Sequence, residues 1–242
     1  MTYYLPQLDP YSFEFPSPSQ AMSEPNGLLA HGGDLQPKRL LNAYQHGIFP
    51  WYSDNDPIMW WSPTPRAIIN PKTFKPTKSL IKFQKKSRYT VTINHTPNTI
   101  IELCASSRDS EETWITSEMI SAYQALANQQ VCHSVEVWDN QQLIGGLYGI
   151  QIGTLFCGES MFSLKSNASK IALWYFCHHF AKQGGELIDC QMMNPHLLTL
   201  GAIEQTRDEF MLTLHTLRTK SVNAKCYTKQ LLTDPFRQNV NE

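Results

Sequence analysis

The segment NASKIALWYFCHHFAKQGG, residues 167–185, constrains the fold of this chain more than any other stretch. Its pattern predicts a helix that ends at the pair Gly184-Gly185, and apolar residues occupy almost every side of it. A helix that is apolar all round is a buried helix. Because the next residues, ELIDCQM, predict a strand, we expect this helix to pack in a structure that combines a sheet with further helices.

The composition is that of a folded chain. Of its 242 residues, 41% are hydrophobic and 17% are charged, which suits one large domain or two modest ones. The formal net charge of −1 gives no general attraction for polyanions. Any contact with nucleic acid would therefore require a local basic patch.

Strand and helix patterns are mixed along the chain, which predicts an α+β or α/β sheet flanked by helices. The first 25 residues, rich in proline, serine and aromatic residues, suggest an extended surface segment. The proline-rich WWSPTPRAIINP places a boundary near 62–65, between a small domain of residues 1–62 and a larger one of residues 63–242. The expected helices are 77–87, 97–105, 117–128, 206–218 and a short one from an Asp34 N-cap to Gly47; the expected strands are 89–94 and two or three within 133–160.

Targeting signals are missing from the sequence pattern. The N-terminus has no basic region followed by a continuous apolar run, and no apolar run approaches the roughly 18 residues of a membrane span. The six cysteines are scattered without a C-x-x-C pair, which argues against a structural zinc site and fits reduced thiols. We therefore expect a cytoplasmic protein without a metal site.

Two features suit nucleic-acid binding. Seven cations and no acid occur between Lys72 and Arg88, which fits either phosphate contact or an ordinary solvated helix face. Trp51, Tyr52 and the pair Trp60-Trp61 fall within eleven residues of proline-rich sequence. Such rings can stack on unpaired bases, or they can seal a domain interface.

The strand ELIDCQM carries polar residues that an ordinary core strand lacks. Because side chains alternate, Asp189 and Gln191 should share one face, and Cys190 should point the opposite way, into the core. Glu159, in FCGESMFS, is a carboxylate among apolar residues and is either a site residue with a raised pKa or a turn carboxylate near the next helix. The face of Cys190 weakens the alternative of a cysteine hydrolase.

Long and unusual blocks of this sequence resemble the bacterial leucyl/phenylalanyl-tRNA–protein transferases. Departures are modest: ALANQQVCHS lacks a glycine that is usual after a Leu-His pair, and Leu147 replaces a common Met. Nothing after about residue 218 is diagnostic. The matching blocks are GLLAHGGDL, LLNAYQHGIFPWY, WWSPTPRAII, ETWIT, HSVEVW, GGLYGIQIGTLFCGESMFS, NASK and LIDCQMMNPHLLTLGA.

The resemblance implies an α+β fold with a small N-terminal domain and a C-terminal domain like the GCN5-related N-acyltransferases (GNAT-like). It implies transfer of Leu or Phe, with Met a further candidate, from aminoacyl-tRNA to the α-amine of proteins that begin with Arg or Lys. The product would be marked for N-end-rule degradation. The expected partners are Leu-tRNA, Phe-tRNA and those proteins; we expect no cofactor and a monomer. The protein substrates and the preference among Leu, Phe and Met stay open.

The implied reaction needs an acceptor for the amine proton, which we assign to the polar residues, and the resemblance implies the residues that bind the substrate. We expect Asp189 to orient the Gln191 amide, whose oxygen accepts an N–H of the attacking amine, with Asn194 holding the amine or the ester. Glu159 would accept the proton or balance the charge of the basic N-terminal residue, and these roles are not ranked. The resemblance implies that the pocket for the amino-acid side chain is formed by Leu147, Phe156, Met161, Ser163, Leu173, Phe176 and Ile188. The residues expected to contact the adenosine are Trp51, Trp114 and Tyr44. Those expected to contact the tRNA backbone are Lys78, Lys82, Lys85, Lys86 and Arg88.

A pocket residue, Ile188, and the catalytic pair lie on opposite faces of one strand in this scheme. We therefore expect a bend or bulge near Cys190 that lets them converge. Two other functions compete with the transferase. An acyl-CoA-dependent N-acetyltransferase would share the fold, but no Q/R-x-x-G-x-G/A turn precedes a predicted helix. A non-catalytic RNA-binding module would leave Asp189, Gln191 and Glu159 unexplained.

Overall fold

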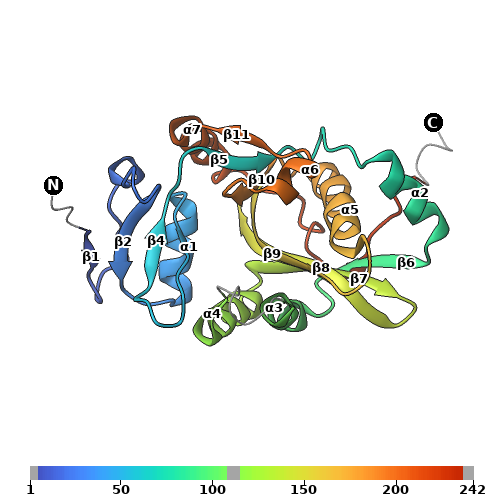
Figure 1. Ribbon diagram of the computed structural model, residues 1–242, viewed down its shortest axis with the longest axis horizontal. Coiled ribbons are helices and arrows are strands. Elements are labelled where there is room, and N and C mark those ends of the chain that lie inside the picture. The colour runs from blue at the N-terminus through green and yellow to red at the C-terminus, as the bar shows by residue number, and fades with distance from the viewer. Residues whose placement is uncertain (1–4, 108–114, 237–242) are drawn as a thin grey trace.

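The computed structural model describes residues 5–107 and 115–236, and their strands form two sheets (Figure 1). The smaller sheet has the order β1-β2-β4-β3, with β1 parallel to β2 and the other pairs antiparallel. The helix α1 (Pro37–Gln45) lies beside this sheet. The strands are β1 (Gln7–Leu8), β2 (Leu28–Gly32), β3 (Phe49–Pro50) and β4 (Met59–Trp61), and a 3-10 helix, η1 (Pro18–Gln20), precedes β2.

The larger sheet has eight strands in the order β11-β5-β10-β9-β8-β7-β6-β12. Only β10 and β9 pair in parallel; the other neighbours are antiparallel. Its strands are β5 (Arg66–Ile69), β6 (Tyr89–Ile93), β7 (Cys132–Asp139), β8 (Gln142–Ile152), β9 (Leu155–Ser163), β10 (Leu187–Gln191), β11 (Ile203–Gln205) and β12 (Gln230–Leu231).

Helices cover both faces of the larger sheet, so the predicted mixed sheet flanked by helices is confirmed. The helices α3 (Pro97–Ser106) and α4 (Ser117–Asn128) cover one face, and α5 (Ala168–Lys182) covers the other (Figure 1). The helix α2 (Lys78–Lys86) packs against α5. Two further helices, α6 (Pro195–Thr199) and α7 (Arg207–Leu217), lie near β10 and β11.

The predicted burial of α5 is confirmed. Ten of its fifteen residues are buried, Ile171 and Phe176 completely. Full burial of a large apolar side chain contributes roughly 1.5–3 kcal/mol each, so this helix is a major part of the core. The C-terminal segment, which carried no diagnostic pattern, packs into the same core: Cys226 and Leu232 are buried, and β12 extends the sheet at β6.

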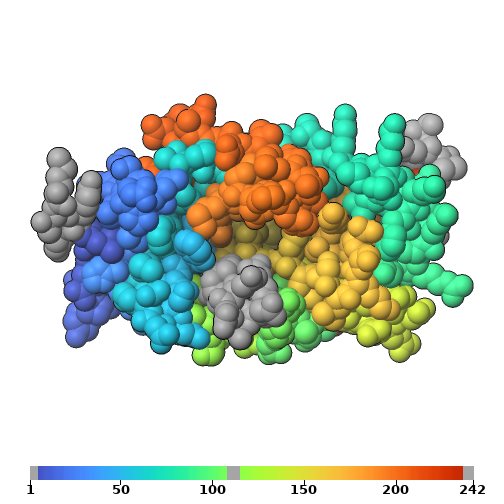
Figure 2. Space-filling model, viewed as in Figure 1, coloured from blue at the N-terminus to red at the C-terminus, as the bar shows by residue number. Residues whose placement is uncertain are grey.

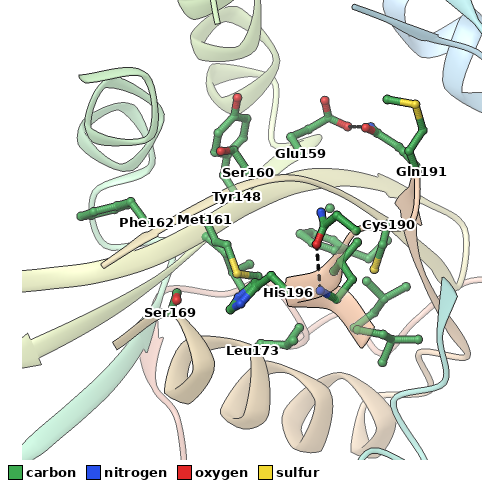
Figure 3. A pocket seen from close by; sticks show the side chains of 18 of the residues that line it. Tyr148, Glu159, Ser160, Met161, Phe162, Ser169, Leu173, Cys190, Gln191 and His196 are labelled. Atoms are coloured by element: carbon green, nitrogen blue, oxygen red, sulfur yellow. Dashed lines mark hydrogen bonds between the residues drawn. The ribbon is translucent and has the colours of Figure 1, made fainter. Parts of the chain in front are cut away.

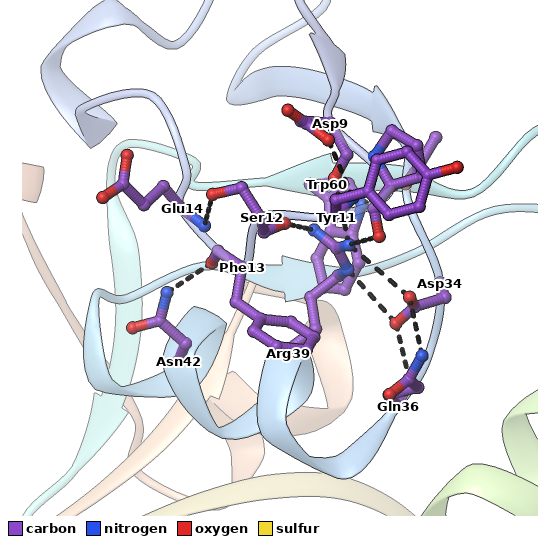
Figure 4. A network of polar contacts seen from close by, with 12 residues as sticks. Asp9, Tyr11, Ser12, Phe13, Glu14, Asp34, Gln36, Arg39, Asn42 and Trp60 are labelled. Atoms are coloured by element: carbon purple, nitrogen blue, oxygen red, sulfur yellow. Dashed lines mark hydrogen bonds and ion pairs between the residues drawn. The ribbon is translucent and has the colours of Figure 1, made fainter.

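The N-terminal segment is fastened to α1 by a buried arginine (Figure 4). The Arg39 guanidinium donates to the carbonyl oxygens of Ser12 at 2.7 Å and Asp9 at 3.2 Å, and pairs with Asp34 at 3.2 Å. Asp34 is therefore not the expected N-cap; Gln36 has that position, and its N–H donates to the Asp34 carboxylate at 2.9 Å. The chain enters the helix later than its sequence pattern indicated.

The tryptophan cluster does not form a stacking surface as a whole. Trp60 is completely buried and donates its indole N–H to the Gly32 carbonyl, and Trp61 is 7% exposed. Within this cluster Trp51 is the tryptophan with a substantially exposed ring, at 36%. Trp60 and Trp61 are therefore core residues of the smaller sheet, which corrects the base-stacking alternative for them.

The two sheets separate along the chain between Trp61 and Arg66, although one apolar cluster continues across them. That cluster includes Leu29 and Tyr44 from the N-terminal part and Tyr123 and Tyr148 from the larger part. The division into domains of residues 1–62 and 63–242 stays a prediction.

Candidate active site

A cavity of about 780 Å³ lies between β8, β9, β10, α5 and α6, and Trp51 reaches it from the N-terminal part. Figure 2 shows this face of the molecule hollowed between α6 and α5, and Figure 3 shows the side chains around it. All seven residues expected to hold an amino-acid side chain line the cavity: Leu147, Phe156, Met161, Ser163, Leu173, Phe176 and Ile188.

Strand register explains why residues far apart in the sequence share this wall. Leu147 of β8 lies opposite Met161 of β9, and Phe156 of β9 lies opposite Ile188 of β10. Opposed residues on neighbouring strands point to the same face, so the four side chains form one surface. The helix α5 closes it with Leu173 and residues one turn away on the same side.

A bulge in β10 directs the polar residues of this strand. Its register against β5 shifts between Asp189 and Gln191, and Gln191 has a left-handed backbone with φ of 64°. The predicted bend near Cys190 is therefore confirmed, but its effect differs from the expectation. Asp189 points away from the cavity, whereas Gln191 lines it together with Cys190. Cys190 is thus a wall residue and only half-buried, not a core residue.

Asp189 is engaged in a buried ion pair with Arg66. The Arg66 guanidinium donates to both carboxylate oxygens, at 2.8 and 2.7 Å, and both side chains are 1% exposed. The remaining amino group of Arg66 donates to the Gly47 carbonyl at 3.1 Å, and its guanidinium lies between the rings of Phe49 and Phe210. A bidentate pair with these extra contacts is the geometry that makes a buried ion pair tolerable.

The expected contact between the Asp189 carboxylate and the Gln191 side chain is corrected by this structure. Asp189 accepts the backbone N–H of Gln191 at 2.9 Å. The Gln191 amide instead donates its Nε2 hydrogen to Glu159 Oε1 at 2.9 Å (Figure 3). Asp189 therefore fixes the backbone at the bulge, and Glu159 orients the amide.

Glu159 is a buried carboxylic acid whose pKa is strongly raised. It lies in β9, which excludes a turn position, and it is 7% exposed. Burial raises its pKa from the ordinary 4.5 to about 7, and the hydroxyls of Tyr44 and Tyr123 offset this only in part. The Tyr123 hydroxyl donates to Glu159 Oε2 at 2.9 Å and shares a hydrogen bond of 2.6 Å with Tyr44.

The other expected site residues are more dispersed. Asn194 lines the cavity and caps α6, since its Oδ1 accepts the Leu197 N–H at 2.8 Å. Tyr44 is buried outside the cavity wall and is linked to the polar group through Tyr123. Trp51 lines the rim, and Trp114 lies outside the described residues. The cations from Lys78 to Arg88 lie on or just after α2 and do not line the cavity.

Sequence reasoning missed two residues that support this site, Arg66 and Tyr123. A signal for Arg66 was present, because a charge directly before the apolar run AII in a strand requires a partner if it is buried. Tyr123 gave no such signal, since a tyrosine on the apolar side of a helix is an ordinary core residue. His196 and Met193 at the cavity rim were also not predicted as wall residues.

Two kinds of structural feature are absent from the described residues. No helix in residues 5–107 or 115–236 is long and apolar enough to cross a membrane. The same ranges hold no group of three or more His, Cys, Asp or Glu side chains placed to bind a metal ion.

A mixed sheet flanked by helices, with an apolar cavity that ends at a carboxylate–amide pair, fits the class of group-transfer enzymes. Sequence comparison gives the particular family. The family described as leucyl/phenylalanyl-tRNA protein transferase matches residues 68–215, and its N-terminal domain matches residues 33–64. This chain belongs to that family, which confirms the resemblance found in the sequence.

Curated relatives align over nearly the whole chain. A protein of Vibrio atlanticus is 62% identical over 96% of this chain and 98% of its own length, and one of Photobacterium profundum is 58% identical over 98% and 100%. Both are named leucyl/phenylalanyl-tRNA–protein transferase. Among solved structures, a Bacteroides thetaiotaomicron protein of unknown function gives a TM-score of 0.42 at 13% identity, covering 62% of this chain and 55% of its own.

Proposed function

We propose that this protein transfers leucine or phenylalanine from aminoacyl-tRNA to the α-amine of proteins that begin with Arg or Lys, and so marks them for degradation. Family membership supports the reaction class. The observation that carries the assignment is the cavity itself, in which an apolar wall ends at the Glu159–Gln191 pair. We also propose that the enzyme acts in the cytoplasm as a monomer.

The apolar wall suits a leucyl or phenylalanyl side chain. The cavity is large enough for either, and the unbranched Met161 can adjust to both shapes. A wall of this kind separates close homologues by only about 1–3 kcal/mol per methylene. Acceptance of two different apolar amino acids, with Met as a third, follows from this weak discrimination.

The reaction needs alignment more than strong activation, because the aminoacyl ester is already reactive. The amine nitrogen forms a bond to the ester carbonyl carbon, and the bond from that carbon to the ribose oxygen breaks. One proton passes from the amine to the leaving hydroxyl. Holding two substrates in reacting geometry can contribute roughly 7–11 kcal/mol, and an α-amine with a reference pKa of about 7.7–8.0 is partly neutral near pH 7.

Glu159 is the proton acceptor in this proposal. Its pKa of about 7 lies where a carboxylate can both take a proton from the amine and return it to the leaving oxygen. Gln191, with its nitrogen held by Glu159, presents its oxygen to an N–H of the amine. Asn194 donates its amide hydrogens to the amine-bearing residue or the ester. Asp189, paired with Arg66, is a positioning residue that holds the bulge.

The tRNA donor would approach across Trp51 and the basic helix α2. Trp51 is exposed at the cavity rim, where its ring can stack on the terminal adenosine. The family resemblance adds Trp114, which lies outside the described residues, as a second contact. Tyr44 is buried and would contribute indirectly, through the hydrogen bond between its hydroxyl and that of Tyr123. Lys78, Lys82, Lys85, Lys86 and Arg88 would contact phosphates, so binding should weaken as salt increases. Backbone contacts without base readout suit a protein that accepts several tRNAs.

The direct test uses purified protein, radiolabelled Leu-tRNA and a peptide with an N-terminal Arg. We expect label in the peptide, and none when its N-terminal residue is Glu. The same peptide with labelled acetyl-CoA tests the rival N-acetyltransferase. Labelling from acetyl-CoA without labelling from Leu-tRNA would reject the proposal.

A further inference from the structure

A second cavity, of about 300 Å³, lies on another side of α5 and is not used by the proposed reaction. Leu173 and Phe176 face the amino-acid cavity, whereas Trp174, Cys177 and Ala181 face this one, as helical periodicity requires. The loop after β5 forms its other wall. The lining residues are Pro71, Lys72, Phe74, Trp174, Cys177, His178, Ala181 and Lys182, and none of them is acidic.

The lining combines aromatic rings with cations. Trp174 is 5% exposed and lies in the packed core beside the partly buried Phe74, while Lys72 and Lys182 are at the rim. An aromatic ring provides a stacking surface for a base, worth roughly 1–3 kcal/mol. Ammonium groups provide charge-assisted hydrogen bonds to a phosphate. The volume is at the lower end of the range for ligand pockets, which suits one nucleotide and excludes a duplex.

The Phe236 ring links Trp174, in the wall of this second cavity, to the basic helix α2. Trp174 contacts Phe236 edge to face with ring centroids 4.9 Å apart, and the Lys85 ammonium lies 5.1 Å from the same Phe236 ring. Next to Lys85 on α2, Gln84 donates its Nε2 hydrogen to the hydroxyl of Tyr175 on α5 at 2.8 Å. Lys72 is also the first cation of the acid-free series that ends at Arg88. A strand of phosphates that runs along α2 would therefore reach the cavity.

We propose that this second cavity binds one unpaired nucleotide of the tRNA donor, with its base against the partly exposed ring of Phe74 and its phosphate between Lys72 and Lys182. The inference rests on the proposed function, which supplies the tRNA. It adds an anchor away from the aminoacyl end. Because the anchor is separate from the reacting atoms, it affects the affinity for tRNA and leaves the chemical step unchanged.

Two variants test the cavity in different ways. Ala181→Leu fills it without changing charge, and the double variant Lys72→Gln/Lys182→Gln removes its cations. Lys38→Gln is the matched control, because Lys38 lies on α1, over the Phe13 ring at 4.8 Å, in the N-terminal part. Each protein is assayed with Leu-tRNA and with a short donor, 3′-O-leucyl-adenosine. Thermal unfolding verifies that each variant is folded.

We expect the two cavity variants to weaken Leu-tRNA binding about tenfold, the size of one lost stacking contact, with kcat and the short donor unaffected. The control should match the wild type. Unchanged tRNA affinity in Ala181→Leu would overturn the proposal. The proposal would also fail if the cavity bound free AMP but neither variant changed the affinity for tRNA. If the wild-type protein used neither donor, the proposed function itself would fail.

A measurement on the wild-type protein does not depend on the folding of variants. Lysine amines are acetylated with a small reagent with and without uncharged tRNA, and the modified sites are read by mass spectrometry. We expect tRNA to protect Lys72 and Lys182 but not Lys38. Equal modification of Lys182 in both samples would contradict insertion of a nucleotide.

Discussion

The two buried arginines, Arg39 and Arg66, show how one side chain can serve two different purposes. Arg39 is completely buried, but its partners are mostly backbone carbonyls of residues 9–12, and the carboxylate of Asp34 is 29% exposed. Arg66 has a single carboxylate partner, Asp189, which is as buried as Arg66 itself. The first arrangement fastens a segment of chain, and the second fixes the backbone of β10 where it carries Gln191, a residue of the proposed active site.

The two networks differ in how well water can reach the polar groups that lose their partner when a contact is broken. Without Arg39, the freed carbonyls belong to a largely exposed segment, and Asp34 can be hydrated. Without Asp189, the guanidinium of Arg66 would keep only the Gly47 carbonyl and the faces of two rings. An unpaired buried charge costs far more than a neutral group that water can reach. Breaking the Arg39 network should therefore lower stability alone, whereas breaking the Arg66–Asp189 pair should lower both stability and the rate of transfer.

The largest effect is expected for Asp189→Ala. Leaving Arg66 buried without its partner should cost about 3–5 kcal/mol of unfolding free energy. Transfer should fall at least about 100-fold, because an aligned catalytic group typically contributes that much, while tRNA affinity stays near the wild type. Urea unfolding, steady-state transfer and tRNA binding measure the three quantities.

A double variant separates stability from function in the same network. Replacing a buried pair by apolar side chains is often neutral or stabilising, so Arg66→Met/Asp189→Leu should recover most of the lost stability. It should not recover activity, because the Gln191 N–H still lacks its acceptor. Normal turnover in this double variant would show that Asp189 has no positioning role.

The next effect is expected for Glu159→Gln. Removing a general base typically costs 10²–10⁴ in rate, and we expect about 100-fold at pH 8. In the wild type, kcat should rise as Glu159 ionises near pH 7; this step should be absent in the variant, which keeps only the rise caused by the substrate amine at about pH 7.7–8.0. A pH–rate profile of both proteins is the measurement; retention of the step near pH 7 in Glu159→Gln would assign the proton acceptor elsewhere.

Stability should respond to pH through the same carboxyl group. Its folded pKa of about 7 lies above the ordinary 4.5, so the folded state binds more protons than the unfolded state between these values. This contribution to stability is complete below about pH 4.5 and is lost as the pH rises to about 7. Glu159→Gln should remove that slope, whereas Arg39→Met should keep it.

A smaller effect, confined to stability, is expected for Arg39→Met. The variant loses its hydrogen bonds to the segment of residues 9–12, which should cost about 1–3 kcal/mol of unfolding free energy. Transfer should stay near the wild-type rate, because Arg39 does not line the cavity and its partners lie in the N-terminal part. A loss of turnover as large as in Asp189→Ala, in folded protein, would remove the distinction between the two networks.

The smallest effect is expected for Leu147→Met, which alters the cavity wall without touching either arginine network. The swap nearly conserves volume, and the ratio of kcat/KM for Leu-tRNA to that for Phe-tRNA should change less than about tenfold. Unfolding free energy should change by less than about 1.5 kcal/mol. Competition between the two aminoacyl-tRNAs measures the ratio, and a switch to exclusive use of one would indicate that Leu147 dominates selection.

Local pattern was sufficient for most of the fold, whereas the apolar wall of the site was predicted from the family resemblance. The helices α2, α3, α4 and α5 begin and end within about two residues of the expected positions, because caps and periodicity are local properties. The bulge at Cys190 was also predictable, since a pocket residue and a polar pair on one strand had to converge. The direction of Gln191 was not, because its left-handed backbone breaks the alternation of side chains and brings its amide to the cavity face with Ile188 and Cys190, away from Asp189.

The sequence by itself determined which segments are helix or strand, which residues are apolar enough to line the cavity, and the family to which the chain belongs. Only the tertiary structure decided which polar group meets which. Arg66 and Asp189 are 123 positions apart and meet because β5 pairs with β10, and the Gln191 amide meets Glu159 because β9 is the other neighbour of β10. A buried charge requires a partner, but sheet order, a non-local property, selects it.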